Sequence, residues 1–169
     1  VTVDTHERRL TNDNAAELIA DYDVVVDASD NFGTRYLVND ACTLAGTPVS
    51  HGAIYRFEGQ VTTFSGNGPC YRCLFPQAPP EGAVPDCATA GVLGVLPGTI
   101  GCFQATEVVK RILGEGESLD GRLLVYDASE MSVEEVPIPR NPDCPVCGDE
   151  PTLSAVAEAS YDGRCSLPE

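Results

Sequence analysis

Four of the eight cysteines stand in two C-x-x-C pairs that lie far apart in the chain. The first pair is Cys70 and Cys73, and the second is Cys144 and Cys147. Each pair lets one tight turn present two sulfurs to an ion, and two such pairs supply the four thiolates of a tetrahedral zinc site. The spacing therefore predicts a structural zinc site that joins the middle of the chain to its C-terminal part. The alternative is two redox pairs or unpaired thiols.

Cys87 is a lone thiol that follows a connection, residues 74–86, with four prolines. It stands just before a helical pattern, and a helix N-terminus favours the reactive thiolate. The neighbouring Asp86 opposes ionisation because like charges repel. The residues alone leave a nucleophilic role and an ordinary loop position equally open. Cys42 and Cys102 fall in apolar helical patterns, so we expect them in the core.

The hydrophobic pattern predicts strands and helices in alternation. The β-branched run 24–26 has the pattern of a strand buried on both faces, and residues 32–45 read as an amphipathic helix that stops at Gly46. Further strands are expected at 1–4, 48–54, 60–64, 122–126 and 132–138, and further helices at 15–20 and 91–113. Pro97 is expected to kink the last helix.

This order of elements predicts an α/β fold with a doubly wound, Rossmann-like and largely parallel sheet, to which the last two strands add an antiparallel pair. Asp30 and Asn31 follow the run 24–26, and ligands of open α/β sheets bind at the carboxyl ends of strands. There an aspartate can hold Mg²⁺ and an asparagine can hydrogen-bond a nucleotide. The alternative is that they cap the next helix. We expect ordinary polar roles for His6 and His51.

No glycine-rich G-x-G-x-x-G loop and no P-loop occur in the chain. The residues alone therefore indicate the C-terminal portion of an α/β nucleotide-binding domain, with a zinc clamp and a lone loop cysteine.

The formal net charge is −16, from 26 acidic and 10 basic residues, of which only one is a lysine. Such a field repels nucleic acids and anionic membranes, which argues against both as partners. The sequence contains no apolar run long enough to span a membrane. The acid-rich, lysine-poor composition is typical of a halophile, and the C-x-x-C pairs favour the reducing cytoplasm.

Five stretches, in one unbroken order, carry a resemblance to a known family. They are residues 27–40 (DASDNFGTRYLVND), 51–64 (HGAIYRFEGQVTTF), 69–76 (PCYRCLFP), 86–107 (DCATAGVLGVLPGTIGCFQATE) and 140–148 (RNPDCPVCG). Together they resemble the MoeB/ThiF/HesA family, which is related to ubiquitin-activating enzymes, and within it the haloarchaeal branch.

The resemblance implies a reaction. Such enzymes use Mg²⁺ and ATP to adenylate the C-terminal Gly-Gly carboxylate of a small ubiquitin-fold or sulfur-carrier protein. They then pass the acyl group to a sulfur or thiol acceptor, in molybdopterin synthesis, tRNA thiolation or protein conjugation. The resemblance also implies a homodimer. It places the family's glycine-rich ATP loop upstream of Val1, so this chain alone is not expected to turn over ATP.

Carried over residue by residue, the resemblance implies a role for each matching position. Asp30 would bind Mg²⁺, Asn31 would contact the nucleotide, and Cys87 would perform thioester or persulfide chemistry. The zinc ligands would be Cys70, Cys73, Cys144 and Cys147.

We expect residues 1–148 to form the C-terminal part of a ThiF-type adenylation domain and residues 149–169 to form a polar, poorly ordered tail. The alternative function is a non-catalytic, zinc-binding partner subunit of such an enzyme. The presence of Asp30, Asn31 and Cys87 argues against that alternative. A nicotinamide-dependent dehydrogenase with a structural zinc shares the fold class, but nothing in the chain selects a hydride substrate.

Overall fold

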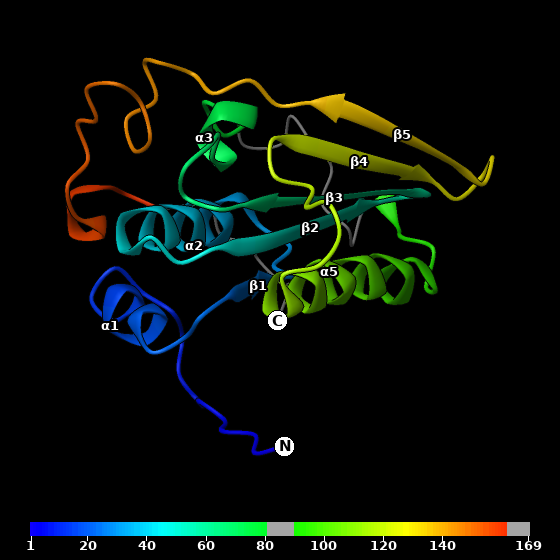
Figure 1. Ribbon diagram of the computed structural model, residues 1–169, viewed down its shortest axis with the longest axis horizontal. Coiled ribbons are helices and arrows are strands. Elements are labelled where there is room, and N and C mark those ends of the chain that lie inside the picture. The colour runs from blue at the N-terminus through cyan, green and yellow to red at the C-terminus, as the bar shows by residue number, and fades with distance from the viewer. Residues whose placement is uncertain (81–89, 162–169) are drawn as a thin grey trace.

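The computed structural model describes residues 1–80 and 90–161 of the 169-residue chain. Its elements, in chain order, are α1 (Ala15–Ala20), β1 (Val25–Asp27), α2 (Phe32–Ala45), β2 (Val49–Tyr55), β3 (Glu58–Phe64), α3 (Tyr71–Leu74), α5 (Leu96–Leu113), β4 (Arg122–Asp127), β5 (Ser132–Pro137) and the 3-10 helix η1 (Val156–Glu158). The strands form one sheet in the order β1-β2-β3-β4-β5. Figure 1 shows this sheet across the middle of the molecule, with α5 below it and α3 above it.

The described sheet is mixed. Only β1 and β2 pair in parallel, and the other three pairings are antiparallel. The α/β class and the antiparallel C-terminal pair are confirmed, but the described strands do not form a largely parallel sheet, which corrects that expectation. The physical reason lies between β2 and β3, where only Arg56 and Phe57 connect the strands. A parallel pair needs a far longer crossover.

Two further expectations are corrected. Residues 1–4 are exposed and form no strand, because no described strand pairs with them, and Figure 1 shows them running away from the sheet. Pro97 lies in the first turn of α5 and starts the helix instead of kinking it, since proline is pre-organised for the first helical positions. Among the residues that the structure describes, no helix has the length and apolar character needed to cross a bilayer.

The sheet is covered on both faces because alternate residues of its strands point in opposite directions. On one face Val49 and Phe64 pack in a cluster with residues of α1, α2 and α3. On the other face Val61 packs against Leu96 and Ile100 of α5. Cores on both faces hold β2 and β3 in place, and with them the end of β1.

The C-terminal segment returns to α2. Figure 1 shows it passing from β5 across the molecule to η1, which lies beside α2. Tyr161 donates a hydrogen bond to Asp40 of α2 (2.8 Å), and Asn12 donates one to the carbonyl of Ala159 (2.9 Å). These bonds join residues 149–161 to the rest of the fold, while the predicted domain boundary at residue 148 stays a prediction.

The contact between β3 and α5 has a test. A Cβ on Gly59 would overlap the side chain of Ile100, which is itself buried. We expect Gly59→Ala to lower the free energy of unfolding of the full-length protein by about 1–3 kcal/mol, because α5 must shift off the sheet. Urea unfolding measures this change. Gly98→Ala is the matched control, since a Cβ there meets nothing within 4 Å and alanine favours the helix. Wild-type stability of Gly59→Ala would contradict the packing.

Candidate functional site

The fold brings the four C-x-x-C cysteines together. The sulfurs of Cys70, Cys73, Cys144 and Cys147 all lie within 4.8 Å of one another. The Sγ atoms are 3.5 Å apart in the pair Cys70–Cys144 and 3.4 Å apart in the pair Cys73–Cys147. Zinc–sulfur bonds of about 2.3 Å in a tetrahedron place sulfurs about 3.8 Å apart. The arrangement therefore fits zinc, and the assignment of these four residues as its ligands stays a prediction.

Each pair is presented by a tight backbone turn. The N–H of Cys73 donates to the carbonyl of Cys70 (2.9 Å), and the N–H of Gly148 donates to the carbonyl of Cys144 (2.9 Å). The N–H of Asn141 also donates to the Sγ of Cys73 (3.3 Å), which stabilises negative charge on that sulfur. A Cβ on Gly148 would overlap the backbone of Cys144, so the second turn requires glycine.

The electrostatics of the cluster favour a cation. The hydrogen bond between Cys70 and Cys144 raises the pKa of Cys70 and lowers the pKa of Cys144 to about 4. Burial, together with the hydrogen bond to Cys73, raises the pKa of Cys147 to about 12. Negative charge on Cys144 thus opposes ionisation of Cys70 and Cys147. A divalent metal ion removes the repulsion and lets all four sulfurs ionise.

An ion pair between the half-buried Arg72 and the buried Asp40 attaches residues 70–74, which we call the metal turn, to α2. Arg72, between two of the cysteines, donates from Nε to Asp40 Oδ1 (2.8 Å) and from Nη2 to Asp40 Oδ2 (2.6 Å). Asp40 is fully buried and also accepts hydrogen bonds from Asn39 and Tyr161. The Oδ1 of Asn39 accepts the N–H of Tyr71 (2.7 Å). Sequence reasoning missed this network, whose only local signal is an arginine between two cysteines.

Asp30 and Asn31 lie between the end of β1 and the start of α2. Asn31 caps α2, because its Oδ1 accepts the N–H of Thr34 (2.8 Å), and its Nδ2 donates to Asp30 Oδ1 (3.2 Å). Asp30 is exposed, and no cationic side chain in the described ranges forms an ion pair with it. The capping alternative thus holds for Asn31, while the carboxylate of Asp30 could take a cation.

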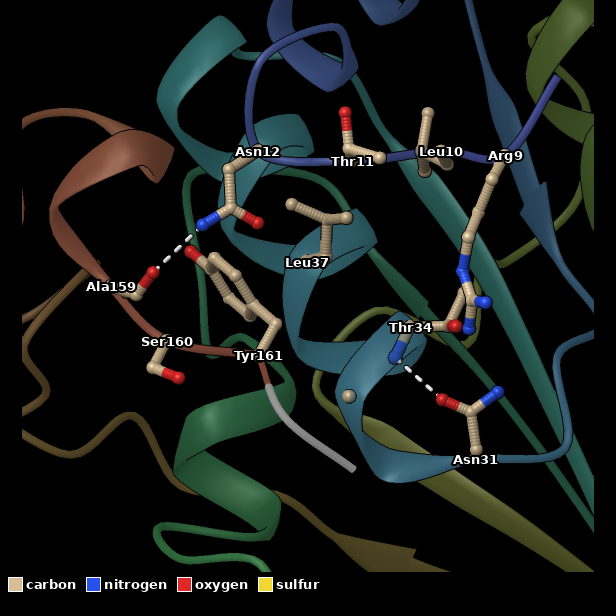
Figure 2. A pocket seen from close by; sticks show the side chains of 11 residues that line it. Arg9, Leu10, Thr11, Asn12, Asn31, Thr34, Leu37, Ala159, Ser160 and Tyr161 are labelled. Carbon is tan, nitrogen blue, oxygen red and sulfur yellow. Dashed lines mark hydrogen bonds between the residues drawn. The ribbon is translucent and has the colours of Figure 1, made fainter. Parts of the chain in front are cut away.

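A cavity of about 460 Å³ borders Asn31. It lies where residues 9–12, the first turn of α2 and residues 159–161 meet. Figure 2 shows Arg9 extending toward the turn of Asn31 and Thr34. Both the arginine and the N-terminus of α2 favour negative charge. The cavity therefore offers space for an anionic group beside the predicted nucleotide-binding residues.

The other cysteines differ in position. Cys87 lies outside the described residues, so its nucleophilic role remains a prediction. Cys42 is buried in α2 as expected, and burial raises the pKa of its thiol to about 12. Cys102 is exposed on α5, which corrects the expectation that it lies in the core. The helix turns another side, with Ile100 and Gln104, toward the sheet.

The metal assignment predicts a measurable loss. We expect the full-length gene product, purified without chelator, to hold about one zinc ion per chain. Cys144→Ser should lose most of this zinc, because a serine hydroxyl is a poor substitute for a thiolate ligand. Mass spectrometry of the metal content checks both values. Cys102→Ser, which changes an exposed thiol outside the cluster, should keep the zinc. Wild-type protein without zinc, or equal zinc in both variants, would contradict the assignment.

Comparisons with known proteins agree with this architecture. The family model of ThiF matches residues 1–146. The SAMP-activating enzyme E1 of Haloferax volcanii is 59% identical over 99% of this chain and 62% of its own length. The sulfur carrier protein adenylyltransferase of Thermus thermophilus is 54% identical over 99% of this chain and 63% of its own length.

The chain thus spans a little over three fifths of the length of these two relatives. A crystal structure of MccB from E. coli with MccA-N7isoASN has a TM-score of 0.63 and 20% identity, and the match covers 75% of this chain and 41% of MccB. At that identity the likeness shows a shared fold alone. The family resemblance drawn from the five motifs is confirmed by the family model and the relatives, and the chain belongs to the ThiF family.

Proposed function

We propose that the protein containing this chain adenylates the C-terminal Gly-Gly carboxylate of a small ubiquitin-fold or sulfur-carrier protein. The carboxylate displaces pyrophosphate from ATP to give an acyl-adenylate, and a sulfur or thiol acceptor then displaces AMP. The observation that carries the proposal is the exposed carboxylate of Asp30, which lies in the segment after β1 and directly precedes Asn31 at the border of the cavity. Relatives named SAMP-activating enzyme E1 and sulfur carrier protein adenylyltransferase support it.

Each residue in and around the cavity has a separate role in the proposal. Asp30 offers oxygen ligands to Mg²⁺, which when bound neutralises charge on the triphosphate. The Oδ1 of Asn31 accepts the helix-cap hydrogen bond and one N–H of its amide donates to Asp30, so the second N–H of that amide is left to contact a nucleotide. Arg9 and the N-terminus of α2 add positive potential at the cavity. Cys87 is the proposed acceptor in the transfer step.

The four-cysteine cluster has a structural role in the proposal. Four thiolates fill the coordination sphere of a zinc ion and leave no position for substrate. The Arg72–Asp40 pair transmits the placement of the metal turn to α2, the helix that begins next to Asp30. In this proposal zinc supports the placement of the segment that carries Asp30 and Asn31, and it takes no part in the reaction.

The proposal extends to assembly and location. A homodimer is implied by the family resemblance, and the C-terminal end of α5 offers a second copy exposed apolar side chains at Val109, Ile112 and Leu113. The six cysteines among the described residues are free thiols, which suits a reducing cytoplasm.

Whether the product serves molybdopterin synthesis, tRNA thiolation or protein conjugation depends on the carrier, and the proposal includes all three.

The role of Asp30 is tested in the full-length gene product by ATP–pyrophosphate exchange with a Gly-Gly-ended ubiquitin-fold protein. We expect Asp30→Ala to lower the exchange rate by about 100-fold or more, because the triphosphate loses a metal contact in the transition state. Asp23→Ala removes an exposed carboxylate before β1 and should behave as wild type. Wild-type exchange in Asp30→Ala would refute its role. No exchange by the wild type with any such carrier would favour the partner-subunit alternative.

The role of Cys87 is tested by separating the two steps. We expect Cys87→Ala to stop the covalent transfer of the carrier while carrier-dependent exchange continues, because adenylate formation precedes attack by the thiol. Non-reducing gels and intact-protein mass spectrometry detect the covalent carrier adduct. Cys102→Ala, at an exposed thiol, is the matched control and should form the adduct. Undiminished transfer in Cys87→Ala would show that Cys87 takes no part in the transfer step.

A further inference from the structure

A buried histidine–aspartate pair lies directly behind the loop that carries Asp30. The Nδ1 of His51 is 2.9 Å from the Oδ2 of Asp27, and the two residues are only 2% and 5% exposed. The sheet register creates this contact, because Asp27 of β1 and His51 of β2 are partners on neighbouring parallel strands. None of the roles assigned above uses either residue.

The direction of the hydrogen bond follows from the charge of Asp27. Burial opposes ionisation, but hydrogen bonds from His51 and Ser29 outweigh it and hold the pKa of Asp27 below its ordinary value. An ionised carboxylate only accepts hydrogen bonds. The Nδ1–H of His51 therefore donates this hydrogen bond, and the carboxylate of Asp27 accepts it.

The other oxygen of Asp27 holds the loop after β1. Oδ1 accepts the N–H of Ser29 (3.0 Å). The carbonyl of Ser29 accepts two hydrogen bonds from Arg35 of α2, at 3.2 Å from Nε and 3.1 Å from Nη2. This carbonyl belongs to the peptide group that leads into Asp30. Both backbone polar groups of the residue before Asp30 are thus fixed by buried or half-buried side chains.

The histidine is itself held from several sides. The ring of Tyr71, which lies between two cysteines of the metal cluster, is centred 4.8 Å from the His51 ring, and Phe64 stacks at 6.5 Å. From the opposite face of the sheet, Gln104 donates to the carbonyls of Asp27 (2.8 Å) and Ser50 (3.0 Å). The two rings pack against the imidazole, and the Gln104 bonds hold the strands that carry it, in the arrangement that places Nδ1 against Asp27.

We propose that the buried His51–Asp27 pair positions Asp30 by fixing the loop between β1 and α2. This inference rests on the proposed adenylation function, in which Asp30 presents its carboxylate to Mg²⁺ and ATP. His51 and Asp27 act through the backbone of Ser29 and are positioning residues, since their side chains are buried away from the exposed carboxylate. A loop held in one conformation loses less entropy when it binds its ligand, which strengthens binding.

The test compares two substitutions at His51 in the full-length gene product. Leucine removes the donor at similar volume, whereas asparagine supplies an amide N–H near the position of Nδ1 and keeps the bond to Asp27. We expect His51→Leu to raise the Mg²⁺–ATP concentration at half-maximal exchange about tenfold, because a buried hydrogen bond to a charged group is lost. The half-saturating concentration of the Gly-Gly carrier should stay at its wild-type value, and His51→Asn should restore the nucleotide value.

A second readout does not depend on activity. Hydrogen exchange of the peptide that spans 27–33 should be faster in His51→Leu than in His51→Asn or wild type, because the Ser29 amide loses its fixed acceptor. Hydrogen exchange in β4 should keep its wild-type rate, and the zinc content should not change. If His51→Leu fails to fold, Arg35→Gln, which weakens the hold on the Ser29 carbonyl, should show the same rise for Mg²⁺–ATP.

The outcomes separate the two proposals. Wild-type nucleotide dependence and wild-type hydrogen exchange in His51→Leu would overturn the positioning role, as would equal losses in His51→Leu and His51→Asn. If His51→Leu does not fold, a wild-type dependence of Arg35→Gln on the Mg²⁺–ATP concentration would overturn the positioning role. Absence of exchange by the wild type with every Gly-Gly carrier would instead overturn the adenylation proposal, and hydrogen exchange would still report whether the pair holds the loop.

Discussion

The buried carboxylate of Asp40 is the point at which α2, the metal turn and the C-terminal segment meet. A buried charge without partners costs several kcal/mol, so the fold must deliver every partner of this one. Arg72 supplies a two-pronged hydrogen bond, and Tyr161 supplies another from a residue 121 positions away. Because Arg72 lies between two cysteines of the cluster, keeping Asp40 in the core and gathering the four sulfurs demand the same placement of α3 on α2. The ion pair to Asp40 and the clustering of the sulfurs thus specify the same position of the metal turn.

The placement of α3 is connected to the loop that carries Asp30, the proposed nucleotide site, through direct packing contacts. Tyr71 of the metal turn contacts His51, His51 bonds Asp27, and Asp27 bonds the residue before Asp30. Each step is a direct contact between buried or half-buried groups, so no long-range signal has to be invoked. The four-cysteine cluster, though distant in sequence from Asp30, can therefore matter for the loop that carries Asp30, because Tyr71 and Asp27 both contact His51 of β2. On the opposite side of the sheet, Gln104 bridges β1 and β2 through hydrogen bonds to the carbonyls of Asp27 and Ser50.

The features that sequence predicted well have local causes. The bounds of α2 follow from the Asn31 cap and from Gly46, whose φ of 71° suits glycine, and the metal cluster follows from cysteine spacing. The antiparallel pairing of β2 with β3 was missed because the two-residue turn lacks the usual glycine, and Arg56 takes the positive φ of 53° instead. The His51–Asp27 and Asp40–Tyr161 contacts were missed because their partners lie 24 and 121 positions apart. The first contact depends on the register of two strands and the second on the C-terminal segment packing against α2. Neither arrangement leaves a periodic pattern in the sequence.

The acidic composition places a further demand on the site. A chain with a formal net charge of −16 repels a triphosphate at long range, so attraction must come from groups close to the ligand. Screening limits the general field to roughly 10 Å at ordinary ionic strength and to less in high salt, while contacts at the site are screened far less. Arg9, the N-terminus of α2 and a cation held by Asp30 would supply such contacts on one side of the fold. Because a bound divalent ion turns the Asp30 carboxylate from a repulsive group into an attractive one, the proposed binding of ATP should depend more steeply on the Mg²⁺ concentration than on the overall charge of the surface.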